Sequence, residues 1–157
     1  MSHKILVSAC LMGELVRYDG QHNLVVHEKL QNLRTQNRLI LACPESLGGL
    51  PTPRAPAEII QSSPSLKVET NNKQDVTEQF LKGAKKTLQL CQSNQIKVAL
   101  MAAKSPSCGN NEIYNGEFNR TLIRQAGITA QLLQKNDIKV FNQNQLTEFF
   151  TYLQQTD

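Results

Sequence analysis

Apolar residues concentrate in four short runs that are separated by longer amphipathic segments. The runs are rich in aliphatic and β-branched side chains and are apolar almost throughout, which is typical of strands buried on both faces. They cover residues Lys4–Ser8, Leu39–Ala42, Lys97–Met101 and Lys139–Phe141. Strands of this kind form parallel sheets that helices cover on both sides.

The segments between these runs carry apolar residues at helical spacing. Asn23 can cap a first helix that places Leu24, Val26, Leu30 and Leu33 on one side. Three further helices are expected at residues 76–95, 129–136 and 145–154. Strands that alternate with helices predict right-handed βαβ units. We therefore expect one α/β domain over residues 1–157, with a small, doubly wound, mainly parallel sheet flanked by helices.

Two stretches depart from this alternation. Residues 44–65 contain five prolines, which lack the amide hydrogen and fix φ. This stretch predicts a long ordered loop rather than a regular helix or a central strand, and loops of this length in compact domains are commonly functional. In residues 113–118, an Asn-Gly pair between apolar and polar positions signals a tight hairpin.

Composition and charge exclude several classes of protein. The 17 Lys and Arg residues are scattered and the formal net charge is only +4, whereas nucleic-acid-binding domains usually carry a concentrated basic stripe. No apolar run approaches the roughly 20 residues that span a bilayer, and the run near the start is too short for a signal-peptide core. We expect a cytoplasmic protein that binds neither nucleic acid nor membrane, in a compartment that keeps thiols reduced.

Three of the four cysteines are placed at the ends of predicted strands or in the following loop. Cys10 follows the first strand, Cys43 ends the second, and Cys108 lies in the loop beyond the third. The carboxyl ends of parallel strands meet at the edge of the sheet where ligands bind, so these thiols should converge. Cys91 instead lies in the apolar stripe of the long helix and is expected to be a core residue.

Three converging thiolates suit a soft metal. The count fits zinc with His22 as a fourth ligand, and it also fits an iron-sulfur cluster with one iron left without a protein ligand. Structural zinc sites generally use pairs such as CxxC, and the sequence contains no such pair. An open site favours chemistry over scaffolding, because the metal can bind and polarise a substrate atom.

Polar residues next to the cysteines are candidates for the other functions of the site. Glu45 is the candidate proton carrier, although a glutamate there could equally be a capping residue or a solvated residue of the loop. Arg54, held between prolines, could clamp an anion or bond the carbonyl groups of its own loop. One cation and two hydroxyls precede the third cysteine, at Lys104, Ser105 and Ser107.

Taken together, these motifs resemble the bacterial thiouracil desulfidase family. The resemblance rests on blocks that each contain one cysteine: residues 10–20, with C-L-M-G and R-Y-D-G; residues 43–58, with C-P-E, G-G-L-P-T-P-R and P-A-E; and residues 104–109, K-S-P-S-C-G. The G-I-T-A stretch at residues 127–130 adds a further match. The resemblance covers most of the chain.

The resemblance implies a 4Fe-4S cluster held by Cys10, Cys43 and Cys108, with one iron left open. It also implies that this iron takes the sulfur of a thiolated pyrimidine such as 2-thiouracil, which leaves as hydrogen sulfide while the base becomes uracil. Roles are implied for Glu45 and Ser105: Glu45 could activate water, and Ser105 could position the base or relay a proton. No net redox change is required, and we expect the cluster to be oxygen-sensitive.

Two other functions remain open on the same residues. A non-catalytic iron-sulfur or zinc protein could use the three cysteines to sense metal or oxygen. A thiol enzyme could use Cys108 as a nucleophile, but it would lack an obvious histidine partner and would leave two cysteines unexplained. Iron and sulfide analysis separates the metal-binding sensor from the thiol enzyme. Sulfide release from 2-thiouracil separates a desulfidase from a sensor.

Overall fold

The computed structural model describes residues 3–156, and its centre is a four-stranded parallel sheet. Four strands form it, in the order β2-β1-β5-β8: β1 (Ile5–Ser8), β2 (Leu39–Ala42), β5 (Val98–Met101) and β8 (Lys139–Asn142). Every neighbouring pair is parallel. The chain order reverses between β1 and β5, as it does in doubly wound sheets, so the predicted fold class is confirmed.

The apolar composition of the strands explains their central position. All four residues of β1 and of β5 are buried, whereas β2 and β8 at the edges keep partly or fully exposed positions. Full burial of one aliphatic side chain stabilises the fold by about 1.5–3 kcal/mol, and these two central strands contribute several such side chains.

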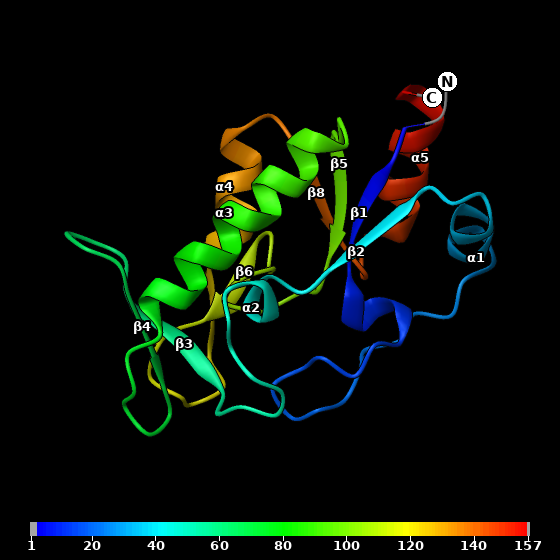
Figure 1. Ribbon diagram of the computed structural model, residues 1–157. Helices are drawn as coiled ribbons and strands as arrows, with labels where there is room; N and C mark the ends of the chain where they lie inside the picture. The colour runs from blue at the N-terminus through cyan, green and yellow to red at the C-terminus, as the bar shows by residue number, and fades with distance from the viewer. Residues whose placement is uncertain (1–2, 157) are drawn as a thin grey trace.

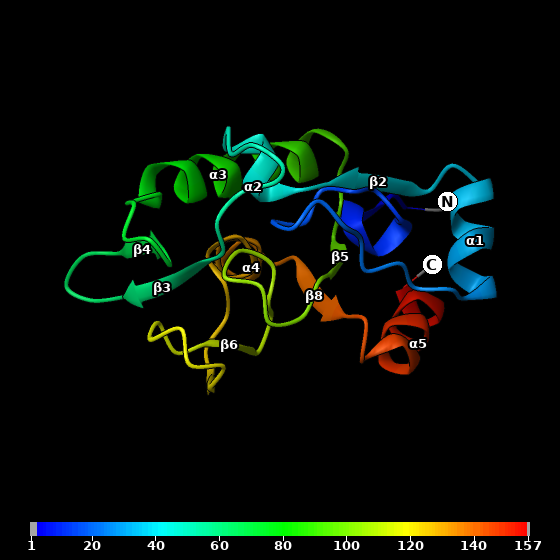
Figure 2. The same cartoon turned by 90° about the horizontal axis from the view of Figure 1, so that it is seen from below.

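Helices cover both faces of the sheet, as Figures 1 and 2 show from two directions. α3 (Thr77–Ser93) and α4 (Ile128–Lys135) pack against each other on one face. α1 (Glu28–Thr35) and α5 (Leu146–Thr156) lie on the other face. Cys91 is fully buried on α3 within the main apolar core, so its predicted core position is confirmed.

Two small antiparallel sheets lie outside the main sheet, below α3 in Figure 1. β3 (Ala57–Gln61) pairs with β4 (Lys67–Thr70), and β6 (Glu112–Tyr114) pairs with β7 (Leu122–Arg124). A second apolar cluster connects them with the first turns of α3 and α4, and it contains Ile59, Val68, Val76, Phe80, Ala84, Ile113 and Ile128.

Residues 44–65 are not the single loop that their prolines predict. Pro44 occupies the first turn of a short helix, α2 (Pro44–Leu47), where a missing N–H is no disadvantage. β3 forms within the same stretch, as one strand of a two-stranded sheet rather than as a central strand. The prolines therefore mark the boundaries of short elements.

The first helix also differs from its prediction. α1 begins at Glu28, and His27 is its N-cap, with a side chain that accepts a hydrogen bond from the Lys29 amide at 3.1 Å. Leu24 and Val26 precede the helix and are 44% and 84% exposed. Their chain segment forms no helix, because its backbone amides donate to carbonyl groups of residues 10 and 11.

The hairpin predicted at the Asn-Gly pair is present but is not tight. β6 and β7 are joined by residues 115–121, and Gly116 opens this loop with φ of 90°. Among residues 3–156, no helix is long and apolar enough to cross a membrane.

Candidate functional site

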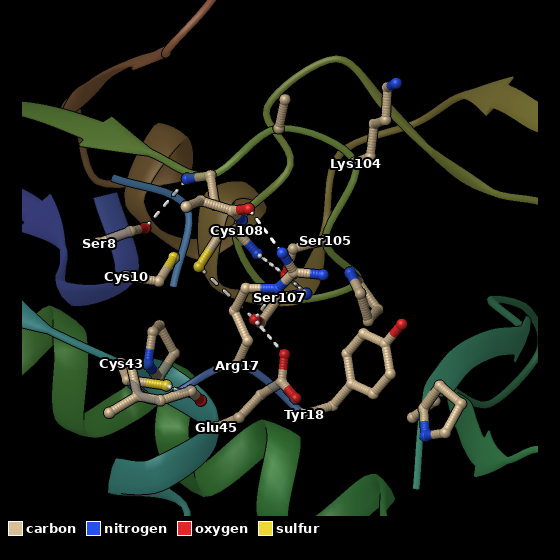
Figure 3. Close-up of a pocket in the computed structure, with 18 of the residues that line it drawn as sticks. Ser8, Cys10, Arg17, Tyr18, Cys43, Glu45, Lys104, Ser105, Ser107 and Cys108 are labelled. Atoms are coloured by element: carbon tan, nitrogen blue, oxygen red, sulfur yellow. Dashed lines mark hydrogen bonds between the residues drawn. The ribbon is translucent and has the colours of Figure 1, made fainter. Parts of the chain in front are cut away.

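The three cysteines that were expected to converge lie at the carboxyl ends of neighbouring strands. Cys10 lies in η1 (Ala9–Met12), a 3-10 turn after β1; Cys43 caps α2 directly after β2; and Cys108 lies in the loop after β5. All three line one cavity of about 780 Å³. Figure 3 shows their sulfur atoms along the same side of this cavity. The sheet topology thus brings together thiols that are far apart in the sequence.

Burial makes the free thiolate form of Cys10 and Cys108 unfavourable. Desolvation, reinforced by the neighbouring cysteines, raises the pKa of Cys10 to about 11 and the pKa of Cys108 to about 12. Arg17 beside Cys10, and the hydroxyls of Ser8 and Ser107 beside Cys108, act in the opposite direction. Thiolates at these positions need additional positive charge nearby, which a bound metal group supplies.

The three thiols could hold either a single metal ion or a cluster. A zinc ion requires all its sulfur ligands at about 2.3 Å from one point. Within residues 3–156, no three His, Cys, Asp or Glu side chains lie close enough together to hold one ion. His22 uses Nδ1 to accept a hydrogen bond from the Leu24 amide at 3.0 Å. A cluster binds each cysteine through a different iron, and the three strand-end thiols that line one cavity fit such a donor set.

Two glycines allow the helix that carries Cys43 and Glu45 to pack closely against α3. A Cβ atom on Gly48 would lie 1.9 Å from the carbonyl oxygen of Gln79 on α3. One on Gly83 would lie 1.9 Å from the carbonyl oxygen of Pro44. The backbones of α2 and α3 therefore touch directly, and this close approach requires glycine on both sides.

Ser105 shapes the loop that presents Cys108. Its Oγ accepts hydrogen bonds from the backbone amides of Ser107 at 3.1 Å and of Cys108 at 3.0 Å. Further along the loop, the Asn110 amide group donates to the Val140 carbonyl oxygen at 3.0 Å, which ties the loop to β8. Ser105 thus has a clear structural task beside its expected role in the reaction.

Glu45 is held between a cation and a hydroxyl. Its Oε1 accepts from Nε of Arg54 at 3.0 Å, and its Oε2 accepts from Oγ of Ser107 at 3.0 Å. The Arg54 and Glu45 side chains are only 8% and 15% exposed. Ser107 Oγ also lies 3.0 Å from Ser105 Oγ and 3.6 Å from Cys108 Sγ. A chain of polar groups therefore runs from the carboxylate to the third cysteine, and Figure 3 shows its central link.

Ser107 and Arg54 have more specific positions than the sequence predicts. Ser107, which the sequence presents only as a turn residue next to a cysteine, is 1% exposed and joins Glu45 to Cys108. The Arg54 side chain is not free to bind an anion, because its Nη2 donates a hydrogen bond to the Val16 carbonyl oxygen at 3.0 Å. Its proline-rich sequence context was the signal that it is held rigidly.

The remaining candidate, Lys104, lines the cavity with an exposed side chain. Three aromatic and two further cationic side chains complete much of the lining, and these are Tyr18, Tyr114, Phe118, Arg17 and Arg120. The cavity therefore combines soft donors on one side with flat apolar rings and positive charge elsewhere.

The fold and the site define a doubly wound α/β protein in which three thiols lie at the carboxyl ends of the strands beside a half-buried Glu-Arg pair. A sequence profile of the family described as 2-thiouracil desulfurase matches residues 5–145. The chain belongs to this family. The resemblance seen in the cysteine motifs is thereby confirmed.

Two individual proteins illustrate the relationship. The protein YbbK of Bacillus subtilis strain 168, described as uncharacterized, is 39% identical over 150 residues, which are 92% of this chain and 98% of that protein. The solved structure of the 4Fe-4S-dependent thiouracil desulfidase TudS is 43% identical and superimposes with a TM-score of 0.93. That match covers 98% of this chain and 99% of TudS.

Proposed function

We propose that this protein is a 4Fe-4S-dependent desulfidase that removes sulfur from thiolated pyrimidines such as 2-thiouracil, giving uracil and hydrogen sulfide. Membership of the 2-thiouracil desulfurase family and the full-length similarity to TudS support this activity. The observation that carries it is the arrangement of three strand-end thiols and the Glu45–Ser107 pair around one cavity. Residues 1–157 would form a single desulfidase domain.

Cys10, Cys43 and Cys108 are the residues that would hold the cluster and leave one of its irons without a protein ligand. When bound, the cluster supplies a thiophilic Lewis acid that withdraws electron density from the substrate sulfur and makes it a better leaving group. Cys91 takes no part, because it is buried in α3 among core residues.

Glu45 is the proton carrier of the proposed reaction. Its Oε2 accepts a proton from a water molecule that adds to the thiocarbonyl carbon, while Arg54 keeps the carboxylate oriented through Oε1. Ser107 then passes this proton along the hydrogen-bonded chain from Glu45 to Ser105, which returns it to the departing sulfur. The hydroxyl of the added water supplies the second proton of hydrogen sulfide as it becomes the carbonyl oxygen. The overall exchange of C=S and H₂O for C=O and H₂S balances in atoms, and no electrons are gained or lost.

The cavity suits a small ligand rather than a macromolecule. Its volume of about 780 Å³ is within the usual range of small-molecule sites, which is about 300–1,000 Å³. The substrate would be a thiolated base or nucleoside, with no role for nucleic acid or membrane. The four cysteines are free thiols, which is consistent with a reducing cytoplasmic location for an oxygen-sensitive centre.

The proposed function is tested by anaerobic turnover of 2-thiouracil with protein whose cluster has been reconstituted. We expect uracil and sulfide to appear in a 1:1 ratio, without an added electron donor. Protein with the Cys10→Ala substitution serves as the matched control and should release neither product. A cluster-loaded protein that releases no sulfide would instead support the non-catalytic sensor.

A further inference from the structure

Glu58 is a buried carboxylate that the proposed chemistry does not use. It lies on β3 in the P-A-E motif, is 8% exposed, and lines the same cavity as the three cysteines. Burial of a carboxylate is costly unless hydrogen bonds compensate for the lost water. The partners of Glu58 therefore indicate what it does.

Two backbone amides of one loop are the partners of this carboxylate. Oε1 of Glu58 accepts hydrogen bonds from the amide of Gly116 at 2.9 Å and from the amide of Phe118 at 3.2 Å. Both amides belong to residues 115–121, the loop that joins β6 to β7. Hydrogen bonds to a charged acceptor are about twice as strong as neutral ones, so this single side chain is a firm anchor for the loop.

The loop has a backbone that needs such an anchor. Gly116, Phe118 and Arg120 have φ values of 90°, 54° and 63°, in the left-handed region that large side chains rarely adopt. A Cβ atom on Gly116 would lie only 2.5 Å from the carbonyl oxygen of Ile59, so the loop presses directly on β3. Conformations of this kind persist only where the surroundings hold them in place.

The anchored loop places two side chains on the cavity wall. Phe118 and Arg120 both line the cavity, and Phe118 is 37% exposed. An aromatic ring at this wall offers a flat apolar surface to a planar base. If the loop became mobile, the cysteines and Glu45 would keep their positions, because they lie on other elements. Only the affinity for the substrate would change.

The geometry points to Glu58 as a positioning residue that fixes the 115–121 loop as the substrate-binding wall of the site. This inference rests on the proposed function, because it assumes that the cavity takes a thiolated pyrimidine. Glu58 touches no reacting atom in this account. It acts through Phe118 and Arg120, and it governs substrate affinity rather than the chemical step.

Paired substitutions at Glu58 test the inference in the cluster-loaded protein. Glu58→Ala removes the acceptor and should raise KM for 2-thiouracil by about three- to tenfold, the factor expected from the loss of one aromatic contact. We expect kcat to change by less than about threefold and iron content to stay at the level of the parent protein. Glu58→Gln retains a carbonyl oxygen for both amides and should restore KM to within about twofold of the parent.

A control variant and a second readout separate this role from a general loss of structure. Glu117→Ala alters an exposed carboxylate of the same loop that does not line the cavity, and it should leave KM unchanged. In cluster-free protein, amide hydrogen exchange at residues 116 and 118 should be faster in Glu58→Ala than in Glu58→Gln. Slower or equal exchange in Glu58→Ala would overturn the anchoring role.

Phe118→Ala carries the test if Glu58→Ala does not fold. It should reproduce the rise in KM while leaving the anchor itself intact. Unchanged KM in Phe118→Ala, or in a folded Glu58→Ala variant with fast exchange, would contradict the loop as a substrate wall. Failure of the parent protein to cleave 2-thiouracil would contradict the proposed function instead, and the exchange measurement would still report on the anchor.

Discussion

One added methyl group at Gly83 should displace the helix that carries Cys43 and Glu45. The new Cβ atom of a Gly83→Ala variant would lie 1.9 Å from the Pro44 carbonyl oxygen, whereas Cβ atoms are not found closer than about 3.0 Å to such atoms. α2 must therefore move away from α3 by at least about 1.1 Å, the difference between these two distances. The 3.0 Å hydrogen bonds of Glu45 would not survive a shift of this size.

The energetic effect combines two opposing contributions. Overpacking of a close contact costs about 1–3 kcal/mol, and alanine gains roughly 1 kcal/mol over glycine within a helix. We expect a net loss of up to about 2 kcal/mol, which lowers Tm by up to about 8 °C in a chain of this size. Misplacement by 1 Å can reduce a rate by about 100-fold, so sulfide release should fall much more than stability does.

Thermal unfolding, iron content and anaerobic sulfide release should be measured for Gly83→Ala beside Lys85→Ala. Lys85 lies on the exposed side of α3 and its truncation should leave all three quantities unchanged. If Gly83→Ala matched this control in all three, the glycine contact would not determine the position of Cys43 and Glu45, and the reasoning would be refuted.

Four further substitutions test the polar chain and the core. Glu45→Gln keeps the shape and should retain the cluster, yet removal of the proton carrier should slow single-turnover loss of thiouracil absorbance by about 100- to 10,000-fold; a change below about threefold would make Glu45 structural. Ser105→Ala should act in the same direction more weakly, and Ser107→Ala should match or exceed it because Ser107 contacts Glu45 directly; the reverse order would contradict the relay. Cys91→Ala should lose on the order of 1 kcal/mol in denaturant unfolding and keep its iron; equal iron loss would contradict its core role.

Features that depend on local apolar pattern could be predicted from the sequence. The strands β1 and β5 are buried on both faces, and their residues, apolar except for Ser8, predict this burial. The convergence of three thiols followed from topology alone, because each lies just beyond the carboxyl end of a parallel strand. The bounds of α3 differ from prediction by no more than two residues, since its apolar stripe is long and regular.

Features that depend on contacts between distant residues could not be predicted. The Ser107–Glu45 hydrogen bond joins residues 62 positions apart, and the contact between Gly48 and Pro44 on one side and α3 on the other is equally non-local. The sequence analysis does not predict β4, a short strand whose one fully buried apolar residue, Val68, packs in the second cluster. The start of α1 was misplaced because Leu24 and Val26 mimic a helical stripe while the backbone pairs with η1.

The most direct test of the account is the iron content of four cysteine variants after anaerobic cluster reconstitution. We predict about four irons per chain in the parent protein and in Cys91→Ala. Cys10→Ala, Cys43→Ala and Cys108→Ala should each lose most of their iron while remaining folded, because the apolar core does not depend on these ligands. Retention of full iron content by any of the three, or an equal loss in Cys91→Ala, would contradict the proposed set of ligands.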